Sequence, residues 1–209
     1  MAINYSNIQA IVFDFGGVLM DWNPRYLYRK LLNDDAVEAL LSRIGFKEWN
    51  EEQDRGRSFA EAVAELCAKF PDDAALIRAY DERYEESLAG SIQGTVAILS
   101  TLKQVGYPLY GLSNWPTEKF NLVRPKYAFF EWFDSIIVSG DVKLIKPDPR
   151  IFAVLLEQIN QRAEDCLFID DSPVNIVAAR RLGFQTIEFE SPEQLNSELH
   201  RLRSLVKIT

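Results

Sequence analysis

Side chains that could do chemistry follow apolar stretches of this sequence at four places. They are Asp14 in VFDFGGVL, Ser113 and Asn114 in GLSN, Lys146 in KLIKPDP, and Asp170 and Asp171 in FIDD. Clustered carboxylates repel one another, which raises their pKa unless a cation neutralises them. Ligands that are all oxygen suit a hard cation, above all Mg²⁺. If the four stretches meet, they predict a metal site that would attract a phosphate group.

Each of these side chains has a use beside a bound phosphate and also a structural alternative. Lys146 can stabilise an anion, and Ser113 with Asn114 can donate hydrogen bonds to phosphoryl oxygens. Asp14 can be a nucleophile, because carboxylates form aspartyl-phosphate intermediates. Taken singly, Ser113 could cap a helix, Lys146 could lie at the surface and Asp171 could cap the helix that follows it. An acid that ends a buried apolar run, as Asp14 does, needs a partner or a function.

The elements that would position these side chains alternate along the chain. Short apolar runs typical of buried parallel strands occupy residues 9–15, 108–112, 135–138, 166–169 and 185–189. Helical patterns separate the later runs, namely TVAILSTLKQVG, PRIFAVLLEQIN and PVNIVAARRLG, with proline at two starts and glycine at two ends. The alternation predicts an α/β fold with a parallel sheet, in which ligands bind beyond the carboxyl ends of the strands.

One long segment breaks this alternation directly after the first strand. Between Trp22 and about Gly90 the sequence has no strand-like run, only amphipathic stretches such as DAVEALLSRIG and SFAEAVAELCAKF. These stretches predict four or five helices, enough for a small bundle. We interpret residues 19–90 as an α-helical cap, and residues 1–18 with 91–209 as the catalytic core. Hinges are expected around residues 19–23 and 90–94.

The composition is that of a folded protein with an acidic surface. Of the 209 residues, 47% are hydrophobic, and 31 acidic against 23 basic residues give a net charge of −8. This charge disfavours nucleic acid and anionic membranes as partners, so an anionic substrate must be bound locally. No run of about 18 apolar residues and no basic leader occurs, and Cys67 and Cys166 lack metal-ligand spacing. We expect a cytoplasmic protein with reduced thiols, either a monomer or a homodimer.

Two other catalytic classes fit the residues poorly. Asp14, Phe15 and Gly16 spell the metal-binding triplet of protein kinases, but the chain is short, lacks HRD and a glycine-rich loop, and carries the triplet near its start. The only histidine, His200, lies in a polar helical pattern near the C-terminus. This position argues against a Ser/His/Asp triad.

Four stretches carry a family resemblance. VFDFGGVL, GLSN, KPDPRIF and FIDDSPVNIVAARRLGF, in this order and with a helical insert after the first, resemble the four motifs of the haloacid dehalogenase-like hydrolase superfamily. The resemblance implies a Rossmann-like core with a mobile helical cap. It also implies a nucleophile at Asp14, a phosphate-binding hydroxyl at Ser113, and a lysine, Lys146, that steadies the nucleophile and the phosphate. Asp170 and Asp171 match the acidic pair that binds Mg²⁺.

Gly16 is where the sequence departs from that family. Its backbone carbonyl would match the main-chain metal ligand, but most phosphatases of the family carry a second aspartate here. That aspartate protonates the leaving group and then activates water, a function worth about 10²–10⁴ in rate. Dehalogenases of the family also lack this aspartate, because a halide leaves without needing a proton. They displace the halogen of a 2-haloacid without a metal. Those enzymes typically lack the acidic pair as well, whereas the pair is intact in this sequence.

The favoured hypothesis is a Mg²⁺-dependent phosphatase that hydrolyses a small phosphorylated metabolite through an aspartyl-phosphate. Similar sugar-1-phosphate phosphatases share the aspartate-x-glycine start, and an anomeric phosphate has a leaving group that needs little acid. The hypothesis predicts fast turnover of aryl, acyl or anomeric phosphates and slow turnover of alkyl phosphates. A metal-independent 2-haloacid dehalogenase-type hydrolase and a catalytically degenerate binding protein are the alternatives.

Substrate choice is expected to depend on the cap and on the loops that face it. Trp22 and Trp115 could stack on a sugar or another ring, and Arg25 could bind an anion. Packing inside the cap is the alternative, and it is favoured for Trp49. Asp21 could replace the missing acid if the loop after the first strand folds back, or it could be a surface or capping residue.

Overall fold

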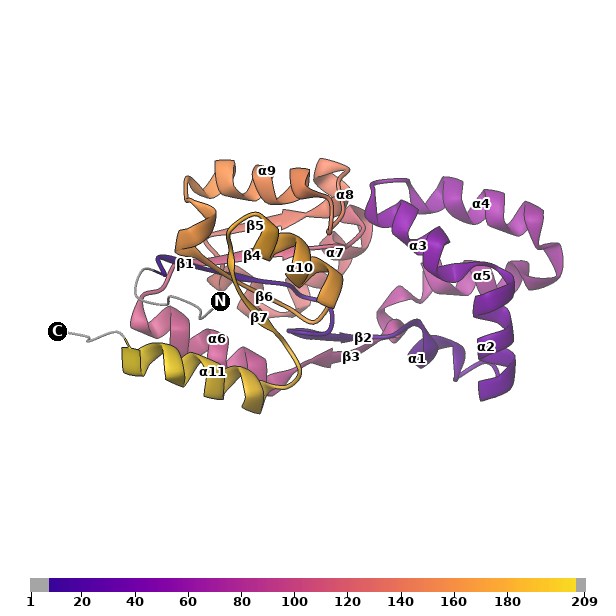
Figure 1. Cartoon of the computed structure of the whole chain (residues 1–209). Helices are drawn as coiled ribbons and strands as arrows, with labels where there is room; N and C mark the ends of the chain where they lie inside the picture. Colours follow the sequence, from indigo (N-terminus) through magenta and orange to yellow (C-terminus); the bar gives the residue numbers. More distant parts are fainter. Residues whose placement is uncertain (1–7, 206–209) are drawn as a thin grey trace.

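The computed structural model describes residues 8–205, in which a parallel β-sheet and a helical insert lie side by side (Figure 1). The sheet has the strand order β5-β4-β1-β6-β7, and all its neighbouring strands are parallel. Its strands are β1 (Ala10–Phe13), β4 (Leu109–Ser113), β5 (Ser135–Val138), β6 (Cys166–Asp170) and β7 (Gln185–Glu188). The predicted α/β, Rossmann-like fold is thereby confirmed, with the first strand of the chain at the centre of the sheet.

Helices cover both faces of this sheet, and β1 shows how the faces divide. The covering helices are α6 (Gln93–Val105), α9 (Pro149–Ile159), α10 (Pro173–Arg181) and α11 (Pro192–Leu205). Ile11 and Phe13 pack in the apolar cluster that contains residues of α6 and α11, whereas Ala10 and Val12 pack in the cluster of α9 and α10. Because β1 is buried on both faces, its sequence is apolar throughout.

The remaining elements of the core are short. They are α7 (Thr117–Val123), α8 (Ser139–Val142) and the 3₁₀ helices η4 (Arg124–Lys126), η5 (Ala128–Trp132) and η6 (Ala163–Asp165). Predicted element ends agree with the structure where a local cause exists. Gly106, in the left-handed region with φ 90°, follows α6, and Asn160, with φ 50°, follows α9.

The insert consists of five α-helices and two 3₁₀ turns. They are α1 (Pro24–Tyr28), α2 (Asp34–Arg43), α3 (Phe46–Asp54), α4 (Phe59–Lys69), η2 (Pro71–Asp73), α5 (Ala74–Glu82) and η3 (Tyr84–Ser87). Aromatic rings from α1, α3, α4 and α5 contact one another in its interior, and Tyr80 of α5 is fully buried among them. Trp49 belongs to this interior, where its indole donates to the Ala62 carbonyl at 3.2 Å. The expectation that Trp49 packs within the insert is consistent with these contacts.

Two short strands connect the insert to the sheet, and the sequence did not predict them. Strand β2 (Met20–Trp22) pairs antiparallel with β3 (Leu88–Ser91), so the two connections run side by side as a ribbon. The pairing joins segments far apart in the chain, and a three-residue strand has too little alternation to be recognised. Strand β2 lies within the expected hinge at residues 19–23, and β3 overlaps the one expected at residues 90–94 at its last two residues.

Among the described residues, no helix combines the length and apolar character needed to cross a lipid bilayer.

Candidate active site

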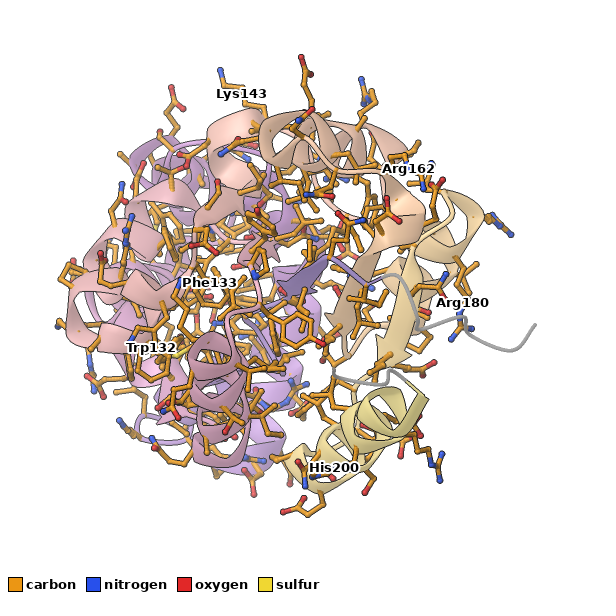
Figure 2. All side chains as sticks on the ribbon, turned by 90° about the vertical axis from the view of Figure 1, so that its left-hand side faces the viewer. Trp132, Phe133, Lys143, Arg162, Arg180 and His200 are labelled. Carbon is orange, nitrogen blue, oxygen red and sulfur yellow. The ribbon has the colours of Figure 1, made fainter. Side chains whose placement is uncertain are left out.

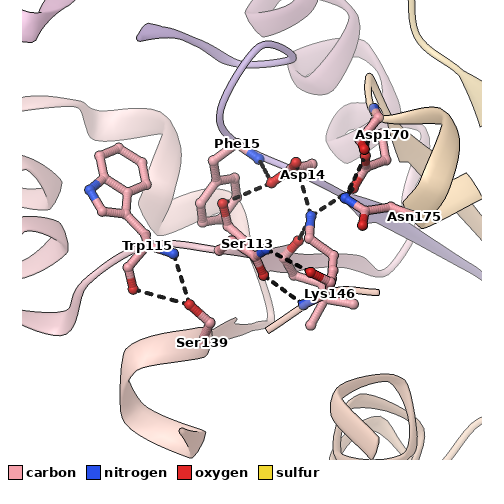
Figure 3. A network of polar contacts seen from close by, with 11 residues as sticks. Asp14, Phe15, Ser113, Trp115, Ser139, Lys146, Asp170 and Asn175 are labelled. Carbon is pink, nitrogen blue, oxygen red and sulfur yellow. Dashed lines mark hydrogen bonds and ion pairs between the residues drawn. The ribbon is translucent and has the colours of Figure 1, made fainter. Parts of the chain in front are cut away.

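Strand register brings the predicted site residues to one edge of the sheet. Strand β1 lies between β4 and β6, and Phe13 pairs with Gly111 on one side and with Ile169 on the other. The residues that follow these positions therefore emerge together at the carboxyl ends of three adjacent strands. Figure 3 shows the result: Asp14 and Asp170 contact the ammonium of Lys146, which reaches them from the loop before α9, and Ser113 donates to Asp14.

The carboxylate of Asp14 is held on both of its oxygens. Oδ1 accepts hydrogen bonds from the Phe15 backbone N–H at 2.6 Å and from the Ser113 hydroxyl at 2.8 Å. Oδ2 lies 2.9 Å from Lys146 Nζ. Only 7% of Asp14 is exposed, so these contacts fix its carboxylate in one orientation. A fixed, partly accessible carboxylate between a hydroxyl and an ammonium has the geometry of an activated nucleophile.

Lys146 is the only cation in direct contact with these carboxylates in the described part of the chain. Its ammonium contacts three oxygens: Leu112 O at 2.9 Å, Asp14 Oδ2 at 2.9 Å and Asp170 Oδ2 at 2.6 Å. An ammonium has three donors, so all of them are used. Burial disfavours the charged form of Lys146, but the charges of Asp14 and Asp170 outweigh burial and raise its pKa. Lys146 therefore stays protonated and links the nucleophile position to the acidic pair.

The acidic side chains at this edge carry more negative charge than Lys146 compensates. Asp14, Asp170 and Asp171 each bring a carboxylate oxygen to within 4.8 Å of the others. Burial and the neighbouring acids raise the pKa of Asp14, and burial followed by the charge of Asp170 raises the pKa of Asp171. Three carboxylates and one ammonium leave two negative charges, which a divalent cation would neutralise. The donor set is all oxygen, as hard cations require.

Asp170 is oriented by groups that the sequence did not single out. Asn175 Nδ2 lies 3.0 Å from Oδ1 and 3.1 Å from Oδ2 of Asp170, and the Ser172 backbone N–H donates to Oδ1 at 2.8 Å. Helix α10 starts at Pro173, so Asn175 in its first turn faces back to the end of β6. The signal was present in the spacing of FIDDSPVN, but an asparagine near a helix start is too common to be recognised alone.

The loop after Asp14 brings backbone rather than side chains to the acidic pair. Gly17 has φ +72°, and a Cβ there would lie 2.2 Å from Asp171 Oδ2. Only glycine allows this close approach together with a left-handed conformation. A Cβ at Gly16, in contrast, would have no heavy atom within 4 Å. Position 16 thus faces open space, so a side chain there would have room.

Gly16 also lines a small cavity of about 70 Å³ between the sheet edge and the insert. Its lining residues are Gly16, Trp22, Asn50, Asp54, Tyr84, Asn114, Trp115 and Pro116. The indole N–H groups of Trp22 and Trp115 face the hydroxyls of Tyr80 and Tyr84 but make no hydrogen bond of good geometry within the described residues. The cavity combines aromatic rings with amide and carboxyl groups directly above position 16.

Asn114 and Trp115 connect the end of β4 to neighbouring loops. The Asn114 amide clamps the backbone of Lys146, with Oδ1 accepting from its N–H at 2.8 Å and Nδ2 donating to its carbonyl at 3.0 Å. The Trp115 backbone N–H donates to Ser139 Oγ at 2.9 Å. Asn114 therefore holds the loop that carries Lys146, a role the sequence did not distinguish from phosphate binding.

Some of the residues considered in the sequence analysis lie away from this edge. Arg25 forms a two-pronged pair with Glu38, at 2.5 and 2.8 Å, and does not line the cavity. Asp21 accepts from the Tyr26 hydroxyl at 2.9 Å, so the loop does not turn it toward Gly16. His200 lies on α11 at the periphery of the view in Figure 2. Its place agrees with the argument against a histidine triad.

Sequence reasoning also missed Asp54, the last residue of α3, which is buried although it is acidic. Its segment, EEQDRGR, reads as a solvated polar helix end. Only the packing of the insert on the sheet edge brings this carboxyl group to the cavity above Gly16.

Comparison with known proteins identifies relatives over most of the chain. The model of the haloacid dehalogenase-like hydrolase family matches residues 8–183. Drimenol cyclase drtB of Aspergillus calidoustus is 28% identical over 92% of this chain, which spans about a third (36%) of that longer protein. Sesquiterpene phosphatase astK of Aspergillus oryzae is 27% identical over 94% of this chain and 97% of its own length. HAD family enzyme bt-2542 of Bacteroides thetaiotaomicron, in complex with magnesium and inorganic phosphate, shares the fold, with a TM-score of 0.67 and 22% identity over 88% of this chain and 95% of that one.

Proposed function

The chain belongs to the haloacid dehalogenase-like hydrolase family, and we propose that it is a Mg²⁺-dependent phosphatase of small phosphorylated metabolites. One observation carries the proposal: Asp14, Asp170 and Asp171 bring carboxylate oxygens within 4.8 Å of one another beside the Ser113 hydroxyl. A dehalogenase that works without metal has no use for this excess of negative charge. The similarity to a sesquiterpene phosphatase supports the same choice.

The donor set fits Mg²⁺. Carboxylates of Asp14, Asp170 and Asp171 with the Gly16 carbonyl would hold the ion. Mg²⁺ has ligands at 2.0–2.1 Å, so its ligand oxygens lie within about 4 Å of one another, close to the observed spacing. When bound, Mg²⁺ supplies positive charge that lowers the pKa of Asp14 and offsets the repulsion between its carboxylate and a phosphate. The bt-2542 complex with magnesium and phosphate agrees with this assignment.

The side chains of this chain would then divide the reaction among them. The Asp14 carboxylate attacks phosphorus, which forms an aspartyl-phosphate and expels the alcohol, and water afterwards returns Asp14 and inorganic phosphate. The Ser113 hydroxyl, now 2.8 Å from Asp14, can rotate to donate to a phosphoryl oxygen. Lys146 stabilises the charge that develops on the phosphoryl group, as a buried ammonium 2.9 Å from the nucleophile can do.

The cavity above Gly16 is proposed to receive the leaving group. Trp22, Trp115 and Tyr84 offer aromatic faces, and the indole N–H groups of Trp22 and Trp115 have no hydrogen-bond partner among the described residues. Rings combined with polar groups suit a hydroxylated ring such as that of a sugar 1-phosphate. An isoprenoid phosphate, which the sesquiterpene phosphatase suggests, would use the rings but leave the indole N–H groups of Trp22 and Trp115 unpaired. We therefore favour the sugar phosphate.

Residues 19–90 are proposed to act as a cap that moves away to admit the substrate. Pockets for metabolites usually have about 300–1,000 Å³, whereas the cavity has about 70 Å³. A sugar leaving group needs more room than this conformation offers. The β2–β3 ribbon is where such a movement would bend.

A panel of substrates tests the function. Phosphate release from glucose 1-phosphate, a nitrophenyl phosphate and farnesyl phosphate would be measured with Mg²⁺ and with EDTA, alongside halide release from 2-haloacids. We expect phosphate release that EDTA abolishes and that Asp14→Asn lowers by at least about 10³-fold, because the nucleophile is lost. Halide release that resists EDTA would instead establish a dehalogenase, and no turnover of any substrate would favour a binding protein.

A further inference from the structure

The cavity above Gly16 contains a carboxyl group that the reaction described so far does not use. Asp54 reaches it from the end of α3, and only 8% of this residue is exposed. Its Oδ2 accepts from Asn50 Nδ2 at 3.3 Å, and Asn50 is itself oriented by the Tyr80 hydroxyl at 3.1 Å. No hydrogen bond to Asp54 Oδ1 occurs among the described residues, so this oxygen is available to a group bound in the cavity.

Position 16 and Asp54 line the same space. A Cβ at Gly16 would meet nothing within 4 Å, so a side chain there has room beside the cavity that Gly16 and Asp54 both line. Three aromatic residues, Trp22, Tyr84 and Trp115, form much of the cavity wall. We propose that Asp54 is the general acid that protonates the leaving group, in place of the acid that glycine at position 16 cannot supply. This inference rests on the proposed phosphatase function.

The chain next to Asp54 is pressed onto the core, which fixes the position of the carboxyl group. Gly56 has φ +91°, and a Cβ there would lie 2.7 Å from the Gly140 carbonyl oxygen. Helix α3 also contacts α8, whose residues Ser139–Val142 follow β5. The Asp54 carboxyl group therefore reaches the cavity only when the insert packs against the core. Protonation of the leaving group is thus coupled to closure of the insert over the substrate.

The charge environment suits a proton donor. Burial, the nearby charge of Glu51 and the charge of Asp14 raise the pKa of Asp54 to about 7, against the lowering effects of Arg55 and of the Asn50 hydrogen bond. A general acid works best with a pKa near the operating pH.

The proposed steps balance in atoms and charge. As Asp14 attacks phosphorus, the P–O bond to the leaving group breaks and the proton of the Asp54 carboxyl passes to that oxygen, which gives a free alcohol. The Asp54 carboxylate then accepts a proton from the water that attacks the aspartyl-phosphate. The P–O bond to Asp14 breaks, inorganic phosphate leaves, and both carboxyl groups return to their starting states.

Leaving-group dependence tests the assignment. For wild type and Asp54→Asn, kcat/KM would be measured with a nitrophenyl, a phenyl and an alkyl phosphate, whose leaving groups rise in pKa in that order. We expect Asp54→Asn to lower kcat/KM about 10²–10⁴-fold for the alkyl phosphate and little for the nitrophenyl phosphate. The nitrophenyl phosphate should show a burst of nitrophenol followed by slow turnover, because the variant also lacks the base for water.

Two further variants complete the design. Gly16→Asp combined with Asp54→Asn should recover at least ten-fold in kcat/KM for the alkyl phosphate, because the family's usual acid is restored in open space. Glu48→Gln removes an exposed carboxylate from the same helix and should change nothing. An equal loss for all three substrates, or no recovery on restoring an acid, would overturn the role of Asp54. Wild type that hydrolyses no phosphate ester would overturn the phosphatase proposal itself.

Discussion

At the scale of single residues, Gly16 and Asp54 together change the expectation for the leaving group. Glycine at position 16 alone predicts a wild-type enzyme that depends strongly on an easily departing group. With Asp54 in the same cavity, that strong dependence is expected of Asp54→Asn instead. Wild type should tolerate poorer leaving groups, so the argument for a sugar 1-phosphate then rests on the polar and aromatic lining of the cavity rather than on Gly16.

Ionisation of buried Asp54 should also lower the free energy of unfolding as the pH rises. Its pKa is about 7 in the folded chain against 3.8 ordinarily, so between these values the folded chain keeps a proton that the unfolded chain has lost. Raising the pH through this window removes up to about 4 kcal/mol of folding free energy. The groups around Asp54 are Asn50 and Glu51 on α3, Arg55 directly after it, Tyr80, Tyr84 and Asp14.

Denaturant unfolding in EDTA between pH 4 and pH 8 measures this effect. As the pH rises, the unfolding free energy of the wild type should fall relative to that of Asp54→Asn, because asparagine cannot ionise. Glu48→Gln serves as the control, since Glu48 is exposed. A difference between Asp54→Asn and wild type that is constant with pH would contradict the burial argument.

Asn175 orients Asp170, a proposed metal ligand, so its loss should weaken metal binding more than folding. Asn175→Ala removes the amide that lies 3.0 and 3.1 Å from the two oxygens of Asp170. Loss of such a supporting group typically lowers metal affinity about 10–100-fold. The Mg²⁺ concentration that gives half-maximal phosphate release measures this shift. Asn196→Ala, an exposed helical asparagine, should leave that concentration unchanged.

At the scale of elements, the loop after β1 shapes the metal site through glycine. Gly17→Ala would place a Cβ 2.2 Å from Asp171 Oδ2, so the carboxylate must rotate away. Gly106→Ala has a comparable positive φ, +90°, but meets nothing within 4 Å. Both variants should lose roughly 1–2 kcal/mol from the left-handed conformation. Only Gly17→Ala should raise the Mg²⁺ requirement, and equal Mg²⁺ requirements in the two variants would contradict the contact.

At the scale of the whole molecule, Lys119 joins the insert to the core. It comes from α7 and donates to the Asp81 carbonyl of α5 at 2.8 Å and to the Asp81 carboxylate, and it lies 4.3 Å from the Phe59 ring centroid. Only 7% of Lys119 is exposed, so these contacts are poorly screened. Any movement of the insert away from the core must break them.

Lys119→Met should therefore ease opening of the insert. Methionine keeps the apolar stem but not the ammonium, and we expect amide hydrogen exchange in Ala74–Glu82 to become about ten-fold faster, with the sheet unchanged. Lys126→Met is the matched control, since its pair with Glu85 also joins core to insert but is exposed. Equal effects of the two variants would contradict a special role for the buried lysine.

Local sequence pattern predicts the strands of the parallel sheet and the acids at its edge, whereas the strand order, with β1 at the centre, comes from the tertiary structure. Buried parallel strands must be apolar, and an acid at the end of such a strand is conspicuous because burying charge is costly, so Asp14 and Asp170 could be found from local pattern alone. The end of helix α6 could also be predicted, because Gly106 adopts the left-handed conformation that ends a helix and that glycine favours.

Which residues line the cavity proposed for the leaving group depends on tertiary contacts. Asp54, Tyr84 and Asn50 lie in helical stretches whose local pattern is that of ordinary helix packing. Arg25 has the chemistry to bind an anion, but in the structure it is paired with Glu38. The orientation of the insert on the sheet edge follows from contacts between residues far apart in the chain, such as that of Lys119 with Asp81. Local sequence periodicity carries no information about such contacts, because it reports only which face of an element is buried and not what covers it.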